Sequence, residues 1–185
     1  MVELVMQSER SAELLKTGDI AAWENVVNEY QMPLSRYLYN MVKDREVAQE
    51  LTQDTFLEAY QAMPKTQDDL NLKAWLYRIA TNNAIQVLRR RKLISWVPWV
   101  DYKPVPNETI DGHEDRLADR EQIHRTLKKI PEKYRAVLLL HDNQGFNCKE
   151  IGRILRISLE AAKKRLARAR EMFRDAYQVV EGRGE

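Results

Sequence analysis

Apolar residues recur every three or four positions along much of this chain, which is the spacing of one face of an α-helix. Residues 17–30 follow this period, and Asp19, directly before the first apolar position, is a suitable N-cap. A second amphipathic helix is expected after Pro33, because proline disrupts a helix interior, and it should end near Lys43. This part of the chain therefore predicts two short helices, each with one apolar face.

Two longer segments with the same period follow, at residues 44–63 and 73–91, and the polar stretch between them indicates a loop at 64–72. Gly and Pro, which interrupt helices, number only six each in 185 residues, whereas Ala, Leu, Glu, Lys and Arg are abundant. No sustained alternation of apolar and polar residues indicates a strand. The sequence predicts an all-α fold.

Helical periodicity then stops in an acidic stretch with three prolines between residues 98 and 106. Prolines at this density prevent a continuous helix. We therefore predict two small helical domains, at residues 1–94 and 117–185, joined by an irregular linker at 95–116. The linker also carries two tryptophans that either pack on the first domain or dock into a partner: Trp96 and Trp99.

The second domain shows the pattern of a helix-turn-helix. After two short helices divided at Pro131, a helix at 148–155 is followed by a turn at 156–158 and a longer helix from residue 159. Ser158 is a reasonable N-cap for that last helix. Three of its residues are expected to face the interior: Ala162, Leu166 and Ala169.

The formal net charge is only +2, from 30 basic and 28 acidic residues, but the charges are unevenly distributed. Between residues 161 and 170 the chain has five cations and no acid: Lys163, Lys164, Arg165, Arg168 and Arg170. In a helix-turn-helix the second helix enters the DNA major groove, where Lys and Arg donate to guanine edges and phosphates. A solvated terminal helix is the alternative, and the preceding helix and turn favour DNA binding.

Two helices of the first domain also carry distinctive polar faces. The face of 44–63 is acidic and rich in amides: Glu46, Gln49, Glu50, Gln53, Asp54 and Glu58. The stripe along 73–91 is polar and partly cationic: Arg78, Asn82, Gln86, Arg89 and Arg90, extended by Arg91 and Lys92. Either face is also compatible with simple solvated surface. Their opposite charges suggest a protein partner for the first and nucleic acid for the second.

Other classes of protein fit the sequence less well. We find no signal peptide, no transmembrane span and no metal site, and the single cysteine, Cys148, is a small buried residue or a redox-sensitive thiol. The nearest approach to a catalytic pair is His141 with Cys148, and no glycine-rich phosphate loop is present. We therefore expect neither an enzyme nor a cofactor. An operator-binding regulator would need an oligomerisation surface or ligand pocket, which the sequence does not reveal.

Three blocks of the sequence together resemble the bacterial RNA polymerase sigma factors of the extracytoplasmic-function (ECF) group, the sigma-70-like group 4. They are DREVAQELTQDTFLEAY, KAWLYRIATNNAIQVLRRRK and LKKIPEKYRAVLLLHDNQGFNCKEIGRILRISLEAAKKRLARAR. The resemblance implies that the first domain is sigma region 2, which binds core polymerase and the promoter −10 element. It implies that the second domain is sigma region 4, a helix-turn-helix that binds the −35 element.

The resemblance also implies roles for single residues. Five would bind the clamp helices of the largest polymerase subunit: Gln49, Glu50, Gln53, Asp54 and Phe56. Eight would contact the −10 element: Lys73, Tyr77, Arg78, Asn82, Gln86, Arg89, Arg90 and Arg91. Five would contact the −35 element: Ser158, Lys163, Lys164, Arg165 and Arg168. The loop at 64–72 would hold a base flipped out of the melted strand.

The sequence departs from the family pattern at several positions. Gln86 stands where Asp or Asn is frequent, and Glu160 to Ala162 replace Gly, Thr and Val, so the promoter sequence does not transfer. Arg156 replaces a glycine usual in the turn, which implies strain if its φ is positive.

The family's partners are the further expectations. They are the clamp helices and flap region of core RNA polymerase, promoter DNA, and an anti-sigma factor on another chain, with a cytoplasmic location and no membrane insertion. The acidic linker would pass through the RNA exit region of the polymerase.

Overall fold

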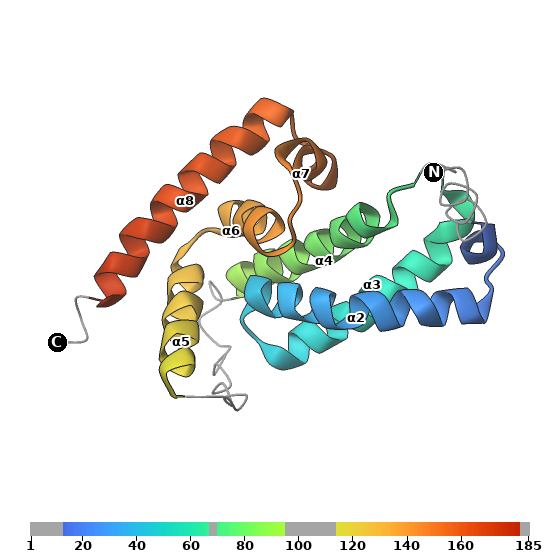
Figure 1. Cartoon of the computed structure of the whole chain (residues 1–185), viewed down its shortest axis with the longest axis horizontal. Helices are drawn as coiled ribbons and strands as arrows, with labels where there is room; N and C mark the ends of the chain where they lie inside the picture. Colours follow the sequence, from blue (N-terminus) through green and yellow to red (C-terminus); the bar gives the residue numbers. More distant parts are fainter. Residues whose placement is uncertain (1–12, 67–69, 95–113, 182–185) are drawn as a thin grey trace.

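The computed structural model describes residues 13–66, 70–94 and 114–181. The first part of the chain contributes α2 (Ile20–Val42), α3 (Arg45–Ala62), the 3₁₀ turn η1 (Met63–Lys65) and α4 (Leu72–Ile94). The second contributes α5 (Glu114–Lys129), α6 (Glu132–Leu138), the π-helical turn η2 (Leu139–Asn143), α7 (Cys148–Leu155) and α8 (Leu159–Glu181), as Figure 1 shows. The prediction of an all-α fold is confirmed within these residues.

The predicted division at Pro33 is wrong, because α2 runs through Pro33 without interruption for 23 residues. Proline removes one backbone donor, but both halves of the helix bury the same apolar face against α3 and α4. Trp23 and Val26 lie on this face before the proline, and Leu34 and Leu38 lie on it afterwards. Tertiary packing therefore outweighs the lost hydrogen bond.

Several helix ends follow the predicted chemistry. The Asp19 carboxylate accepts a hydrogen bond from the Ala22 amide at 2.8 Å, and the Ser158 hydroxyl accepts one from the Ala161 amide at 3.1 Å. Helix α2 ends at Lys43, as predicted, with φ of 60°. Arg156, in the helix-turn-helix turn, has φ of 52°, so the strain expected from an L-residue in the left-handed region is present.

The turn between α7 and α8 requires a glycine one turn earlier, at Gly152. A Cβ atom at Gly152 would lie 2.9 Å from the backbone oxygen of Ile157, which is too close for a carbon atom. We expect Gly152→Ala to lower the free energy of unfolding by about 2 kcal/mol, because the backbone oxygen cannot turn aside as a flexible side chain would. Chemical denaturation measures this difference.

Gly145→Ala is the comparison, since Gly145 has φ of 76° and nothing within 4 Å of an added Cβ. It should cost about 1 kcal/mol through backbone strain alone. If Gly152→Ala cost no more than Gly145→Ala, close packing of the turn would not be the reason for the glycine.

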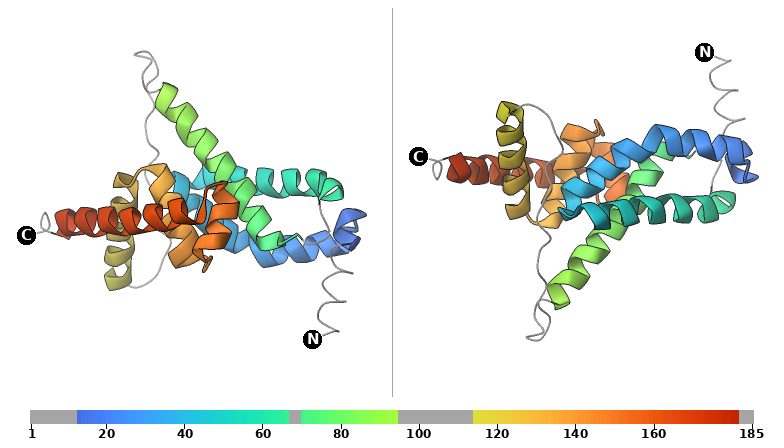
Figure 2. Two further views of the ribbon diagram at one scale, coloured as in Figure 1. Left: turned by 90° about the horizontal axis from the view of Figure 1, so that it is seen from above. Right: turned by 90° about the horizontal axis from the view of Figure 1, so that it is seen from below.

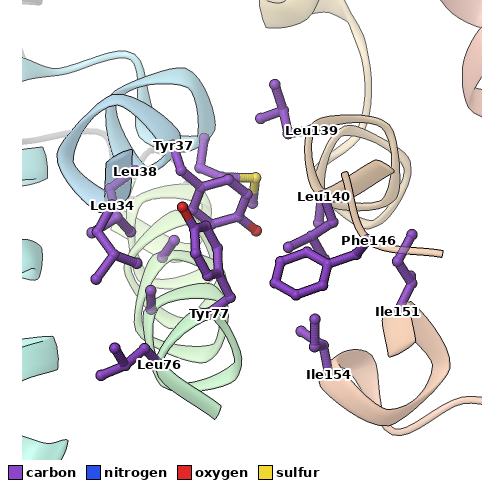
Figure 3. Packing of buried hydrophobic residues seen from close by; sticks show 14 of the residues in the cluster. Leu34, Tyr37, Leu38, Leu76, Tyr77, Leu139, Leu140, Phe146, Ile151 and Ile154 are labelled. Carbon is purple, nitrogen blue, oxygen red and sulfur yellow. The ribbon is translucent and has the colours of Figure 1, made fainter. Parts of the chain in front are cut away.

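The two parts of the chain pack against each other. Helix α4 contacts α6 and α7, and α2 contacts α6 and η2. Figure 3 shows Tyr77 of α4 facing Phe146, which precedes α7, and their ring centroids lie 5.3 Å apart in an edge-to-face arrangement. The buried apolar residues form one cluster across the junction. The structure is therefore a closed arrangement of two helical domains.

Candidate nucleic-acid and protein interfaces

Helix α8 presents the predicted cationic face to solvent. Ala162, Leu166 and Ala169 are buried, as predicted, which turns Lys163, Lys164 and Arg168 outward. Lys163 pairs with Glu160 at 3.0 Å and Arg168 pairs with Glu171, but both pairs are exposed and weak. Ser158 caps the helix and Arg165 is partly buried, so the five predicted −35 residues lie along one end of α8.

Arg170, the fifth cation of this helix, has a different environment. Its guanidinium donates to the Asp142 carboxylate at 2.7 Å and lies 3.2 Å from Nδ1 of His141. Burial alone would raise the pKa of Asp142, but hydrogen bonds from Arg170 and His141 lower it below the ordinary value. This ion pair fastens α8 to η2.

The C-terminal part of α4 projects away from the rest of the molecule (Figure 2). Four of the predicted −10 residues on this helix are exposed: Asn82, Gln86, Arg89 and Arg90. Arg91 is partly buried and forms an ion pair with Asp44 at 2.8 Å, so it also braces α4 against the start of α3. Amide and guanidinium groups are thus available along the projecting end of the helix.

The N-terminal part of α4 is covered by the second domain. The Lys73 ammonium donates to the backbone oxygen of Gln144 at 2.9 Å and lies 4.8 Å from the ring centroid of Phe146. Tyr77 is fully buried, and its hydroxyl donates to the Gln144 side chain at 2.5 Å. Burial raises the pKa of Tyr77, which keeps this donor protonated. Contact of Lys73 and Tyr77 with DNA stays a prediction, and it requires the junction to open.

The acidic and amide-rich face of α3 is exposed over its whole predicted length. Gln49, Glu50, Gln53 and Asp54 are all exposed, whereas Phe56 is partly buried and packs on the core. Four of the five predicted polymerase contacts can therefore meet another protein directly, and Phe56 supports the helix from behind.

One residue of this face was missed by the sequence analysis. Leu57 is 56 % exposed, and it follows Gln53 by four positions and Asp54 by three, which places it beside them on α3. The sequence does contain a signal for this position, because Leu57 is an apolar residue that falls outside the apolar stripe of the helix. An exposed Leu among acids and amides supplies the apolar centre that protein interfaces commonly have.

Both halves of the chain match known sigma factor families. Residues 26–94 match Sigma-70 region 2, and residues 120–173 match Sigma-70, region 4. The chain belongs to the sigma-70 family. Its resemblance to the ECF group, predicted from three sequence blocks, is confirmed.

Several relatives match almost from end to end. RNA polymerase sigma factor SigZ of Bacillus subtilis is 30% identical, with 86% of this chain and 87% of SigZ covered. ECF RNA polymerase sigma factor SigW of the same species is 29% identical, with coverage of 91% and 96%. Among solved structures, sigma factor RpoE in complex with the anti-sigma factor NepR from Bartonella quintana shares the fold with a TM-score of 0.73 at 20% identity, covering 86% of this chain and 99% of RpoE.

Two features of the described residues bear on other functions. None of the described helices combines the length and the apolar character needed to cross a bilayer. Within the same ranges, no group of three or more His, Cys, Asp and Glu side chains is arranged to hold a metal ion.

Cys148, at the start of α7, is partly buried and packs against the core. The predicted linker contacts of Trp96 and Trp99 lie outside the described residues.

A cluster of basic side chains lies where sigma region 2 meets region 4. The buried Arg135 of α6 donates to the backbone oxygens of Met41 and Ile130, and the His124 ring stacks on Tyr39 with centroids 4.9 Å apart. Burial, then the charges of Arg135 and Lys128, lower the pKa of Lys43 to about 6, against the opposing effect of Glu121. Burial and the charge of Lys43 lower the pKa of His124 to about 4.

The lowered pKa values of Lys43 and His124 predict how the stability of the closed sigma factor depends on pH. Between the ordinary pKa of 10.5 and the value of about 6 for Lys43, the unfolded chain binds a proton that the folded chain does not. The free energy of unfolding should therefore fall as the pH is lowered through this window. Because the pKa of His124 is lowered from 6.5 to about 4, the free energy of unfolding should fall a second time as the pH is lowered through that range.

We expect Lys43→Met to flatten the fall in the first window and to reduce the fall in the second only in part, because burial is the larger cause of the lowered pKa of His124 and the charge of Lys43 is the second. Denaturant titrations at a series of pH values test this. The matched control is Lys129→Met on α5, since Lys129 is exposed and should leave the pH profile unchanged. Identical profiles for Lys43→Met and the unaltered chain would rule out a buried, neutral Lys43.

Proposed function

We propose that this sigma factor binds core RNA polymerase through α3 and directs it to promoters whose −35 element is read by α8 and whose −10 element is read by α4. The observation that carries the proposal is the separation of exposed faces by charge. An acidic and amide face lies on α3, and cationic faces lie on α4 and α8. One protein partner and two DNA elements can therefore be engaged by different surfaces at the same time.

At the −35 element, the exposed Lys163, Lys164 and Arg168 would contact base edges and phosphates in the major groove. The Ser158 hydroxyl caps the N-terminus of α8, so this residue would lie at the end of the helix that meets the DNA. Arg165 would both support the domain and reach a phosphate. Because phosphate contacts release counterions, binding should weaken steeply with salt.

At the −10 element, Asn82 and Gln86 would donate and accept hydrogen bonds with unstacked bases, and Arg89 and Arg90 would follow the backbone. Capturing bases in single-stranded form stabilises the open duplex without covalent chemistry. Lys73, Tyr77 and Arg78 would join this surface after the domain junction opens, and Arg91 would join it without that opening, since its ion pair with Asp44 lies within region 2. The flipped-base role of the loop at 64–72 falls partly on residues 67–69, which the structure does not describe.

The closed arrangement would then be the form without polymerase. Lys73 and Tyr77 are engaged by Gln144 and Phe146, so the start of α4 is unavailable to DNA until the domains separate. Docking of α3 on the clamp helices and of region 4 on the flap would hold the domains apart, and the linker at 95–116 would pass through the RNA exit region.

We further propose that the protein acts in the cytoplasm, where the polymerase is, as an initiation factor and not as an enzyme. Control by an anti-sigma factor on another chain is expected for it, as the RpoE–NepR complex illustrates for RpoE. The competing hypothesis is an operator-binding regulator, which would bind duplex DNA firmly by itself.

Permanganate footprinting of a promoter tests the proposal against this alternative. Thymines of the −10 element should become reactive only when both core polymerase and this protein are present. Asn82→Ala should reduce the reactivity by about tenfold, while region 4 continues to bind its element. Protection of duplex DNA by the protein alone, with no reactive thymines when core is added, would support the regulator.

A further inference from the structure

A group of basic side chains lies where the end of α2 meets α5 and α6. Lys43 ends α2, and the Arg135 guanidinium of α6 donates to the backbone oxygen of Met41 in the last turn of α2. The His124 ring of α5 stacks on Tyr39 of α2 with centroids 4.9 Å apart. This group, called here the basic junction, therefore draws on both domains: Lys43, His124 and Arg135.

The charges at the basic junction are close enough to act on one another. Burial is the largest cause of the lowered pKa of Lys43, and the charges of Arg135 and Lys128 come next. Burial likewise comes first for the pKa of His124, followed by the charge of Lys43. Glu121 opposes these effects without outweighing them. The basic junction therefore has an excess of positive charge.

The acidic side chains around the basic junction do not balance this excess. Among the described residues, these acids pair with cations outside the junction: Glu121 with Arg125, Glu132 with Lys92, and Asp44 with Arg91. Basic groups that are withdrawn from water without a counter-ion are unfavourable. A bound anion would supply the missing negative charge.

Two buried nitrogens of the junction have no hydrogen-bond partner in the part of the chain that the structure describes. They are Nε2 of His124 and Nε of Arg135, in residues that are only 7 % and 8 % exposed. The other two guanidinium nitrogens of Arg135 donate to backbone oxygens, so Nε alone is left for a ligand. A buried donor without an acceptor is unfavourable, which points to a ligand that accepts hydrogen bonds.

We propose that the basic junction binds a chloride ion, with the Arg135 Nε–H group, the His124 ring and the Lys43 ammonium as its donors. A carboxylate or phosphate is commonly held by two parallel N–H groups of one Arg, and Arg135 has only one such group left. A monatomic anion fits this arrangement, because it accepts from donors that arrive from three different helices. Since Lys43 belongs to region 2 and the other two donors to region 4, the ion would join the domains.

Chloride binding should be coupled to protonation, because the ion requires Lys43 and His124 in their charged forms. The pKa of Lys43 is about 6 without the ion, and a bound anion would raise it. Above that pH, binding includes the uptake of a proton, so the affinity should fall by about tenfold for each pH unit. Chloride should therefore offset part of the fall in stability that acidification causes.

Thermal unfolding of the full chain in sodium chloride and in sodium gluconate of equal ionic strength tests the site. With chloride at about ten times its Kd and at about pH 6, Tm should be about 4 °C higher in chloride. At about pH 8 the difference should nearly vanish, because the affinity has fallen by about 100-fold.

Variants separate this site from general binding of anions to a basic protein. Lys43→Met should remove the difference between the two salts at the lower pH. His124→Phe keeps a ring to stack on Tyr39 and should reduce the difference, because it removes one donor. Lys129→Met is the matched control, since Lys129 is exposed on α5, and it should leave the difference unchanged.

Bromide takes the place of chloride and scatters X-rays anomalously, so it locates the ion directly. A crystal grown in bromide should show an anomalous peak between Lys43, His124 and Arg135. This peak would support the proposal even if the variants failed to fold.

Two results would overturn the proposal. In the first, Tm is equal in the two salts and no bromide peak lies at the junction, which would leave a water molecule as the partner of the buried nitrogens. In the second, Lys43→Met and Lys129→Met respond equally to chloride, which would make it an adventitious ion only. No polymerase or DNA takes part, so either result leaves the proposed promoter function intact.

Discussion

Asp54→Lys is expected to lower the affinity of this sigma factor for core RNA polymerase by about 100-fold. Asp54 is exposed at the centre of the α3 face, between Glu50 and Leu57. A charge reversal there places a cation where the partner surface is expected to be cationic, and like charges across an interface cost about 3 kcal/mol. Biolayer interferometry with immobilised core polymerase measures the change.

Asp175→Lys is the control, because Asp175 is exposed on α8 and undergoes the same change in charge far from α3. It should leave the affinity for core unchanged. Both variants should unfold at the temperature of the unaltered chain, since neither side chain is buried. Equal affinities for Asp54→Lys and the unaltered chain would show that α3 is a solvated surface and not the polymerase contact.

The double variant Lys164→Ala, Arg168→Ala should weaken binding of the holoenzyme to a promoter by about 100-fold, with core affinity unchanged. Each side chain is exposed on α8, and the loss of a base or phosphate contact costs about 1–3 kcal/mol. The slope of log affinity against log salt should become shallower by about 2 if both residues contact phosphates. Electrophoretic mobility shifts at several salt concentrations provide both quantities.

Arg174→Ala is the matched change on the same helix, beyond the expected DNA contact, and it should preserve both affinity and slope. An unchanged salt slope in the double variant, together with unchanged affinity, would mean that the cationic end of α8 does not lie against DNA.

Much of this arrangement could be predicted from local sequence because it depends on contacts within a helix or across one turn. The spacing of Ala162, Leu166 and Ala169 fixes which side of α8 is exposed. The carboxylate of Asp19 and the hydroxyl of Ser158 cap helices a few residues away. The positive φ of Arg156 follows from the position that it occupies in a tight turn.

The domain junction could not be predicted in this way, because its contacts join residues far apart in the chain. Tyr77 meets Gln144 across 67 positions, and no helical period signals that contact. The same is true of Arg135, whose guanidinium reaches the end of α2 across 94 positions. The continuity of α2 through Pro33 has a similar cause, since burial against α3 and α4 decides it.

Run-off transcription with purified core polymerase tests the central claim most directly. Reactions with and without this protein, on fragments of its source genome, should differ by new transcripts that start downstream of a shared pair of −35 and −10 elements. Asp54→Lys should abolish these transcripts and Asp175→Lys should preserve them. If an active core gave no new starts and did not co-purify with the protein, the chain would not be acting as a sigma factor for that polymerase.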